Sequence, residues 1–200
     1  MKRQVLVIHG GTSFDSYDDY LHFIKNRELS VDRLKHQYDW KARLSQELGD
    51  SFEVLQPRMP NSTNARYEEW VIWFERCAEF LRDDVILVGH SLGGIFLAKY
   101  LSERTVVFEV LATILVSAPY NDVFTEESLV EFELPDSLDL LSMQGGSICV
   151  FHSKDDHVVP YGDALEYKRC IPNLEVFTFE DRGHFNQEEF PELVALLKSL

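Results

Sequence analysis

The residue types that most clearly indicate chemistry in this chain lie in one glycine-rich stretch, Gly89-His90-Ser91-Leu92-Gly93-Gly94. Four bulky apolar residues precede it at 85–88, and an apolar-periodic stretch follows at 95–101. The pattern Gly-x-Ser-x-Gly between a buried strand and a helix predicts a sharp turn that strains the serine backbone and exposes its hydroxyl. Glycine is expected at 89 and 93 because a side chain there would strike the neighbouring strand or the start of the helix. Ser91 is therefore the candidate nucleophile; the alternative is a glycine-rich turn with an incidental serine.

A serine hydroxyl is a poor nucleophile at neutral pH, so it needs a base, and the base needs an orienting acid. The chain supplies such groups in the order Ser91, then Asp155 or Asp156, then His184. This order is typical of the nucleophile turn described above. His184 lies between two other loop residues directly after a predicted strand, which favours it as the base. The other histidines considered are His152 in a predicted strand, His157 beside the acids, His90 inside the turn, and His22 and His36, which belong to no motif.

Acyl transfer also needs N–H donors for the oxyanion that develops in the transition state. The Leu92 N–H, directly after the nucleophile, is one candidate. Gly11, with Thr12 next, is the second, because it follows the first predicted strand; the alternative is a tight strand exit. We expect His90 and Thr12 to contact substrate. A metal site at His152, Asp155, Asp156 and His157 is the less favoured interpretation of those residues, because their spacing fits no standard ligand motif.

The elements that must position these residues alternate between strand and helix along the chain. Apolar runs predict strands at 5–8, 52–55, 85–88, 112–116, 148–152 and 175–179, and helices are expected near 34–48, 65–82, 91–101, 163–170 and from Pro191 to the C-terminus. Short strands that are apolar on both faces predict a doubly wound, mostly parallel α/β sheet of about six strands, with helices on both faces. If the first and third strands are neighbours, the turn after Ile8 faces Ser91.

Two stretches give weaker patterns. Residues 13–32 are irregular, acidic and aromatic, with at most a helical turn expected, and residues 120–146 resemble a loop with weak helix near 126–132. Asn61-Ser62-Thr63-Asn64 offers N-caps for the helix that follows. In this arrangement the acyl pocket would be built from residues 12–32 and 118–146, so the sequence leaves substrate identity open.

Composition limits the function classes. Two hundred residues fit a single domain, 1–200, and a formal net charge of −15 argues against nucleic acid or an anionic membrane surface as partner. No segment reaches membrane-spanning length, and the apolar run near the N-terminus is too short for a signal peptide. Cys77, Cys149 and Cys170 are odd in number and widely spaced, which indicates reduced residues of a cytoplasmic protein. Oligomeric state is left open.

Three motifs together resemble a known family. They are Gly89-His90-Ser91-Leu92-Gly93, Ser153-Lys154-Asp155-Asp156-His157-Val158-Val159-Pro160 and Asp181-Arg182-Gly183-His184-Phe185, with Met59-Pro60 also similar. They look like the motifs of the small serine hydrolases related to retinoblastoma-binding protein 9 and YdeN. The resemblance implies an α/β-hydrolase without a large cap domain, no cofactor, and Asp156 as the acid. The longer segment between Gly11 and Leu34 departs from the family, and Phe14, Tyr17 or Tyr20 could fold over the substrate entrance.

These observations together predict a cytoplasmic serine hydrolase that cleaves a small-molecule ester, thioester or amide through an acyl-enzyme. Ser91 attacks, His184 takes and returns the proton, Asp156 orients the imidazole, and Leu92 and Gly11 hold the oxyanion. The rival hypothesis is a scaffold of the same fold that binds partners without catalysis. A complete set of nucleophile, acid, base and oxyanion turn speaks against the scaffold.

Overall fold

Six parallel strands form one sheet with the order β2-β1-β3-β4-β5-β6. The computed structural model describes residues 2–35, 38–122 and 128–200. The strands are β1 (Arg3–Ile8), β2 (Phe52–Leu55), β3 (Val85–His90), β4 (Val110–Val116), β5 (Ser147–Ser153) and β6 (Glu175–Phe179). All six predicted strands are present, and β1 and β3 are neighbours, with Ile8 in register with Gly89. The predicted α/β-hydrolase architecture is confirmed.

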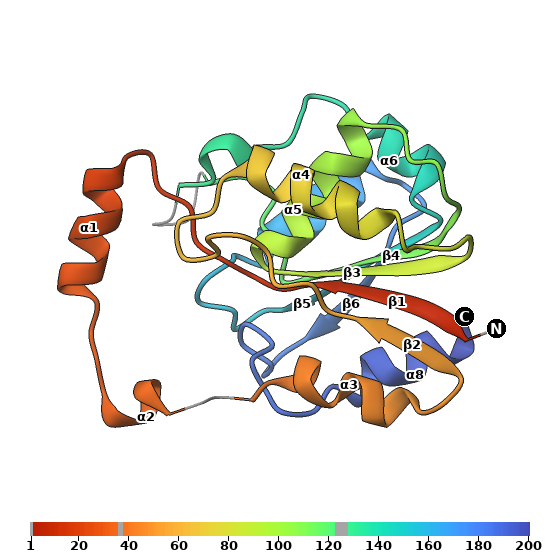
Figure 1. Ribbon diagram of the computed structural model, residues 1–200, viewed down its shortest axis with the longest axis horizontal. Coiled ribbons are helices and arrows are strands. Elements are labelled where there is room, and N and C mark those ends of the chain that lie inside the picture. Colours follow the sequence, from red (N-terminus) through yellow and green to blue (C-terminus); the bar gives the residue numbers. More distant parts are fainter. Residues whose placement is uncertain (1, 36–37, 123–127) are drawn as a thin grey trace.

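Helices cover both faces of this sheet (Figure 1). One face carries α4 (Tyr67–Ala78), α5 (Leu92–Glu103), α6 (Asp139–Gln144) and α7 (Gly162–Cys170), and the other carries α3 (Trp40–Leu48) and α8 (Pro191–Ser199). Each face has its own apolar core. Trp70, Phe74 and Phe96 are fully buried on the first face, and Trp40 and Phe190 lie against each other on the second. Burial of this aromatic area is the main term that stabilises the two layers on the sheet.

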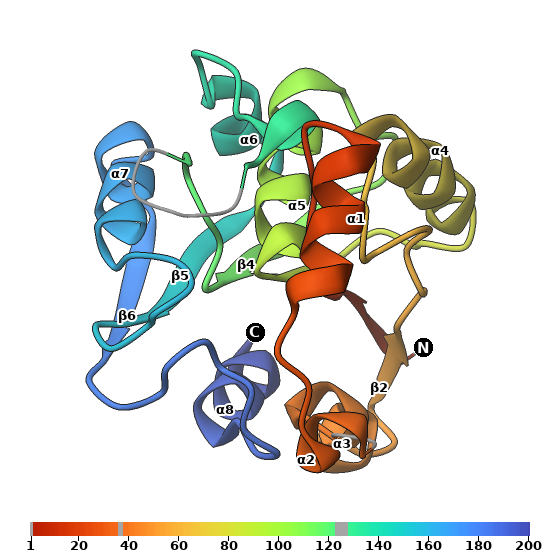
Figure 2. The same ribbon diagram turned by 90° about the vertical axis from the view of Figure 1, so that its left-hand side faces the viewer.

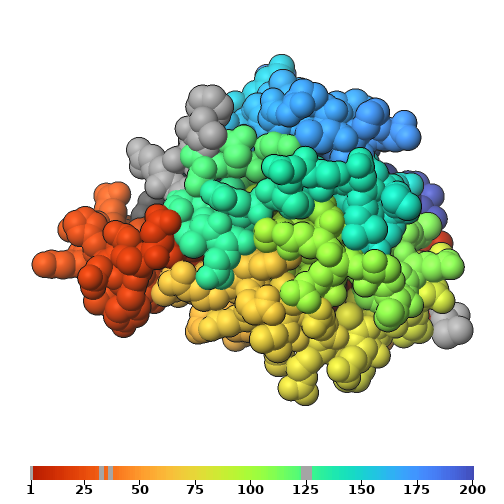
Figure 3. All heavy atoms as spheres, turned by 90° about the horizontal axis from the view of Figure 1, so that it is seen from above, coloured from red at the N-terminus to blue at the C-terminus, as the bar shows by residue number. Residues whose placement is uncertain are grey.

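The segment between β1 and α3 differs from its prediction as an irregular stretch. It contains α1 (Tyr17–Asn26) and the short α2 (Val31–Leu34), and α1 stands away from the sheet (Figures 1 and 3). The Ser16 hydroxyl caps α1 by accepting the N–H of Asp19 at 3.1 Å. Tyr17, Tyr20, Leu21 and Ile24 recur at the spacing of one helix face, although none of the residues of α1 is buried.

Other helix boundaries also differ from those predicted from the sequence. The helix expected over 34–48 begins only at Trp40, where the Asp39 carboxylate accepts the N–H of Lys41, and residues 36–37 lie outside the described part. The helix expected over 65–82 begins at Tyr67 after Arg66, so the predicted N-caps at 61–64 are wrong. The stretch 120–146, expected as a loop with weak helix near 126–132, contains α6 and the 3₁₀ turn Val130–Phe132; residues 123–127 of that expectation are not described.

The carboxyl ends of the strands meet at one edge of the sheet, which faces the viewer in Figure 2. Seen from that side, α1 and the chain that leads from it to α2 pass in front of this edge. Parallel α/β sheets bind ligands at such an edge. In the described residues, no helix is long and apolar enough to cross a membrane.

Candidate active site

Ser91 occupies the sharp turn between β3 and α5. Its backbone has φ 55° and ψ −125°, in the left-handed region that costs a non-glycine residue about 1–3 kcal/mol. The Ser91 N–H donates to the Val116 carbonyl at 2.8 Å, which ties the strained residue to β4. A Cβ at Gly89 would lie 2.4 Å from the Gly93 carbonyl, and one at Gly93 would lie 2.4 Å from the Ile8 carbonyl. As expected, a side chain at 89 would strike the start of α5, and one at 93 would strike the neighbouring strand β1.

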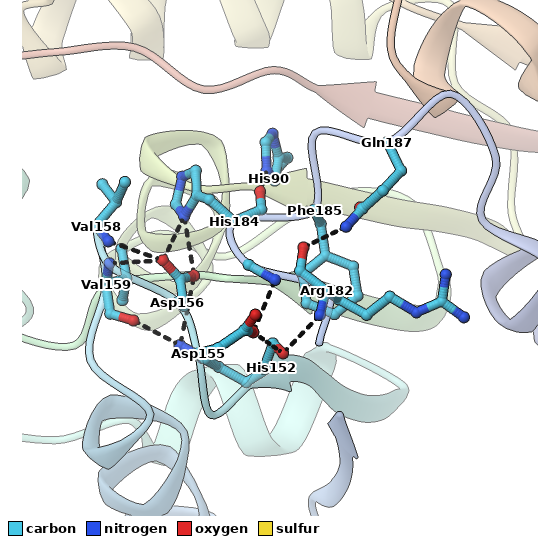
Figure 4. A network of polar contacts seen from close by, with 12 residues as sticks. His90, His152, Asp155, Asp156, Val158, Val159, Arg182, His184, Phe185 and Gln187 are labelled. Atoms are coloured by element: carbon cyan, nitrogen blue, oxygen red, sulfur yellow. Dashed lines mark hydrogen bonds and ion pairs between the residues drawn. The ribbon is translucent and has the colours of Figure 1, made fainter. Parts of the chain in front are cut away.

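Asp156 and His184 form a buried pair beyond the ends of β5 and β6 (Figure 4). His184 Nδ1 lies 2.9 Å from Asp156 Oδ2 and 3.1 Å from Oδ1. The N–H groups of Val158 and Val159 donate to Oδ1 at 2.9 and 3.1 Å. Burial by itself raises the pKa of Asp156, but the bonds from His184 and the two amides outweigh it, so this pKa lies below its ordinary value. An ionised carboxylate holds the proton on Nδ1 and leaves Nε2 as the basic nitrogen.

His90 brings the nucleophile turn and the histidine loop together. Its Nε2 lies 2.8 Å from the carbonyl oxygen of His184, and the two imidazole rings are 5.1 Å apart between centroids. Its Nδ1 lies 3.1 Å from Lys41 Nζ. The ring of His90 is thus buried with both nitrogens bonded inside the protein, a different position from the substrate contact that we expected.

No hydrogen bond joins Ser91 to His184 across the residues that the structure describes. In unliganded enzymes such bonds are often long and tighten when substrate binds. The turn of Ser91 and the loop of His184 are nevertheless neighbours, because His90 Nε2 lies 2.8 Å from the His184 carbonyl oxygen. Val159, whose N–H holds the Asp156 carboxylate, also lines the cavity beside Ser91.

The turn after β1 lies against the nucleophile. A Cβ at Gly10 would be 3.1 Å from the Ser91 Cβ, so this backbone passes close to the serine. The Thr12 N–H donates to the Ser62 carbonyl at 2.8 Å and is therefore occupied. The described residues offer no hydrogen-bond partner to the Gly11 N–H, which leaves it and the first N–H of α5, at Leu92, as the free donors beside Ser91.

His9 fixes the orientation of this turn. The Met59 N–H donates to His9 Nε2 at 2.9 Å, so Nε2 has no proton, and Nδ1 donates to the Gly10 carbonyl at 2.6 Å. In a planar trans peptide the carbonyl and the next N–H point in opposite directions. The contact with His9 therefore sets the direction of the Gly11 N–H.

A small cavity opens beside the nucleophile. Its enclosed volume is about 20 Å³, and the residues around it include Gly11, Ser13, Ser91, Leu92, Leu129 and Val159. Ser13 and Ser128 also line a groove under α1, so the groove adjoins the cavity. Phe14 packs against Tyr20 and Phe23 at centroid distances of 5.5 and 5.1 Å, whereas Tyr17 is largely exposed. Of the three aromatic residues expected near the entrance, two thus hold α1 to the chain beside the turn.

Some site residues carried no signal in the sequence. From α3, Trp40 contacts the loop of His184 and Lys41 contacts His90 in the nucleophile turn. Asp155, the other candidate acid, instead accepts the N–H of Gly183 at 2.8 Å. Aspartate is a common N-cap residue, so the sequence can indicate a helix start at Asp39. It does not indicate the direction of the Trp40 and Lys41 side chains. Among the described residues, no group of three or more His, Cys, Asp or Glu is arranged to hold a metal ion.

Comparison with known proteins identifies relatives. A family model described as Serine hydrolase matches residues 33–198. Serine hydrolase RBBP9 of Rattus norvegicus is 31% identical over 166 residues, which cover 82% of this chain and 85% of that protein. The crystal structure of the ydeN gene product from B. subtilis has a TM-score of 0.78 at 23% identity and covers 99% of this chain and 98% of its own. Est1E from Butyrivibrio proteoclasticus, solved with ferulic acid bound, has a TM-score of 0.62 at 14% identity, over 98% of this chain and 87% of its own.

Proposed function

The chain belongs to the serine hydrolase family, and on that basis we propose that it cleaves a small carboxylic ester, thioester or amide through an acyl-enzyme on Ser91. The observation that carries the proposal is the Asp156–His184 pair, at 2.9 Å, in the loops that adjoin the strained serine turn. This pair lies at the carboxyl edge of the sheet, where parallel α/β folds bind their ligands.

In the first step the Ser91 hydroxyl attacks the substrate carbonyl carbon while His184 Nε2 takes its proton. Asp156 stabilises the imidazolium that forms and keeps the ring in one orientation. The imidazolium then protonates the leaving alcohol, thiol or amine, and the carbon–heteroatom bond breaks. Water then attacks the acyl carbon while His184 Nε2 takes its proton, the bond to Ser91 Oγ breaks, and His184 returns the proton to Ser91 as the carboxylic acid is released.

The oxyanion of each tetrahedral intermediate is held by the N–H groups of Leu92 and Gly11. Leu92 contributes the first N–H of α5, where the helix dipole also favours negative charge. Removal of one donor of this kind usually costs about 3–4 kcal/mol of transition-state stabilisation. Thr12 is assigned to the wall of the substrate site instead of the oxyanion, because its N–H is bonded to Ser62.

The substrate is a small acyl compound. The cavity beside Ser91 encloses only about 20 Å³, well below the roughly 300–1,000 Å³ of typical ligand pockets, so it has room for no more than a small acyl group. The net charge of −15 disfavours nucleic acid and anionic membranes as partners. Cys77, Cys149 and Cys170 are free thiols, which fits action in the reducing cytoplasm.

A fluorophosphonate probe and p-nitrophenyl acetate turnover test the proposal. The wild-type protein should be labelled at Ser91 and should release nitrophenol, and Ser91→Ala should lose both activities. Loss of the nucleophile from such a triad costs about 10⁶ in turnover. Ser102→Ala, whose hydroxyl donates to the Ala98 carbonyl on the same helix, is the matched control and should retain both. Equal turnover by wild type and Ser91→Ala would instead favour the scaffold hypothesis.

A further inference from the structure

The amino end of α3 holds the loop that carries His184. Trp40 Nε1 donates to the Phe185 carbonyl at 2.9 Å, and the Trp40 N–H donates to the Gln187 carbonyl at 2.7 Å. Phe185 itself has a φ of 52°, so this loop contains a strained residue that its neighbours must hold in place. Two direct bonds from one residue of α3 therefore fix the backbone just after the proposed base.

A third link runs from α3 through the nucleophile turn. Lys41 Nζ lies 2.5 Å from Asp39 Oδ2 and 3.1 Å from His90 Nδ1. An ammonium group only donates hydrogen bonds, so His90 Nδ1 must accept. The proton of the neutral ring is then on Nε2, which donates to the His184 carbonyl at 2.8 Å. Lys41 thereby selects the one tautomer of His90 that can hold the backbone of His184.

The surroundings keep His90 neutral. Burial is the largest influence that lowers its pKa well below the ordinary value, and the charges of Lys41, His184 and His9 act in the same direction. Burial also lowers the pKa of Lys41, while the nearby Asp39 carboxylate opposes that shift. The backbone carbonyl of His184, which accepts the hydrogen bond from the ring, opposes this shift.

We propose that Lys41 is a positioning residue for the hydrolytic reaction, which it serves through His90 by fixing the backbone of His184. The inference rests on the proposed function, because its consequence is the direction of the imidazole. His90 holds the His184 carbonyl and Asp156 holds its Nδ1, so the backbone and the ring of His184 are both fixed for the proton transfer at Nε2 that the proposed reaction needs. Without Lys41, His90 can take the other tautomer, in which Nε2 and the His184 carbonyl are both acceptors and repel each other.

The test compares Lys41→Met, His90→Leu and the double variant in p-nitrophenyl acetate turnover and in the rate of fluorophosphonate labelling. Lys41→Met should lower kcat about 10- to 100-fold with KM nearly unchanged, because a small displacement of a catalytic group can cost about 10²-fold. The double variant should be no slower than His90→Leu alone, because the lysine acts through the histidine. His90→Gln, which keeps an N–H donor toward the His184 carbonyl, should recover part of the kcat that His90→Leu loses.

The control is Lys168→Met. Lys168 also holds a loop in place, because it donates to the Pro172 and Leu174 carbonyls just before β6. This loop lies at the amino ends of the strands, away from the site at their carboxyl ends. Lys168→Met should lower the melting temperature but leave kcat unchanged. A wild-type kcat in Lys41→Met, or losses from Lys41→Met and His90→Leu that multiply in the double variant, would overturn the proposal. Failure of the proposed function is distinct: Ser91→Ala would then turn over substrate as fast as wild type.

Discussion

Asp155 and Gly183 are joined by a hydrogen bond of 2.8 Å from the Gly183 N–H to the Asp155 carboxylate. The neighbouring Asp156 instead binds the ring of His184, at 2.9 Å. Two adjacent carboxylates thus hold the same loop at different points, one at the imidazole and one at the backbone before it (Figure 4). The hydroxyl of Ser153, 2.5 Å from Asp155, and the Gly183 N–H hold the pKa of Asp155 below its ordinary value. Both carboxylates are therefore ionised near neutral pH, but only Asp156 contacts the base.

Replacement of Asp155 and Asp156 one at a time should separate their contributions to kcat. Asp156→Ala should lower kcat by about 10⁴-fold, because the imidazole loses its orienting charge. Asp155→Ala should lower it only about 10-fold, through a looser backbone at 183. The measurement is kcat for p-nitrophenyl acetate with circular dichroism as a folding check. Equal losses in the two variants would reject Asp156 as the acid.

His9 should matter for kcat even though it does not contact the serine. In His9→Ala the Gly10 carbonyl loses its partner and the Gly11 N–H is no longer held toward the oxyanion, so kcat should fall about 10-fold, a fraction of the effect of a lost donor. His22→Ala, at an exposed position on α1, is the control and should retain wild-type kcat. Unchanged kcat in His9→Ala would show that the oxyanion turn is held without it.

Alanine at the two glycines of this turn should have different effects. A Cβ at Gly11 would lie 2.6 Å from the Ser62 carbonyl, so Gly11→Ala must shift backbone and should destabilise the fold by about 1–3 kcal/mol. A Cβ at Gly10 would lie 3.1 Å from the Ser91 Cβ, closer than an ordinary contact, so Gly10→Ala should crowd the nucleophile and lower kcat with a smaller loss of stability. Urea unfolding and kcat measured on both variants distinguish the outcomes, and the reverse pattern would contradict them.

Asp163 should make the stability depend on pH. Burial raises its pKa to about 6, although the N–H groups of Tyr120 and Asn121 oppose the shift. The folded protein therefore binds this proton more tightly than the unfolded chain, whose value is near 3.8. Between about pH 4 and 6 this group lowers the free energy of unfolding as pH rises, by on the order of 2 kcal/mol for a shift of about two units.

The Asp163→Asn variant isolates this contribution, because its amide oxygen can still accept the Tyr120 N–H. Above pH 6 it should be more stable than wild type by on the order of 2 kcal/mol, with the difference vanishing near pH 4. Urea unfolding of both proteins at pH 4, 5.5 and 7 measures the difference. A difference that does not change with pH would refute the assignment.

Much of the framework was predictable because its signals are local. The apolar runs determine the strands, since the four central strands are buried on both faces, and the glycines around Ser91 mark a turn that few other residues could form. The helix from Pro191 was equally clear, because proline suits the first helical position. By contrast, α1 is expected only as a helical turn within an irregular stretch, although Tyr17, Tyr20, Leu21 and Ile24 follow helical spacing, and none of its residues is buried in the core.

The sequence by itself determined the parallel sheet, the serine turn and the order of the candidate nucleophile, acid and base along the chain. Only the tertiary structure decided that Asp156 and not Asp155 meets the ring of His184, that the Thr12 N–H is already bonded, and that Lys41 reaches His90. The physical reason is that spacing along a chain sets which residues occur at a strand end. The direction of each side chain there depends on backbone torsions and on packing against segments distant in sequence.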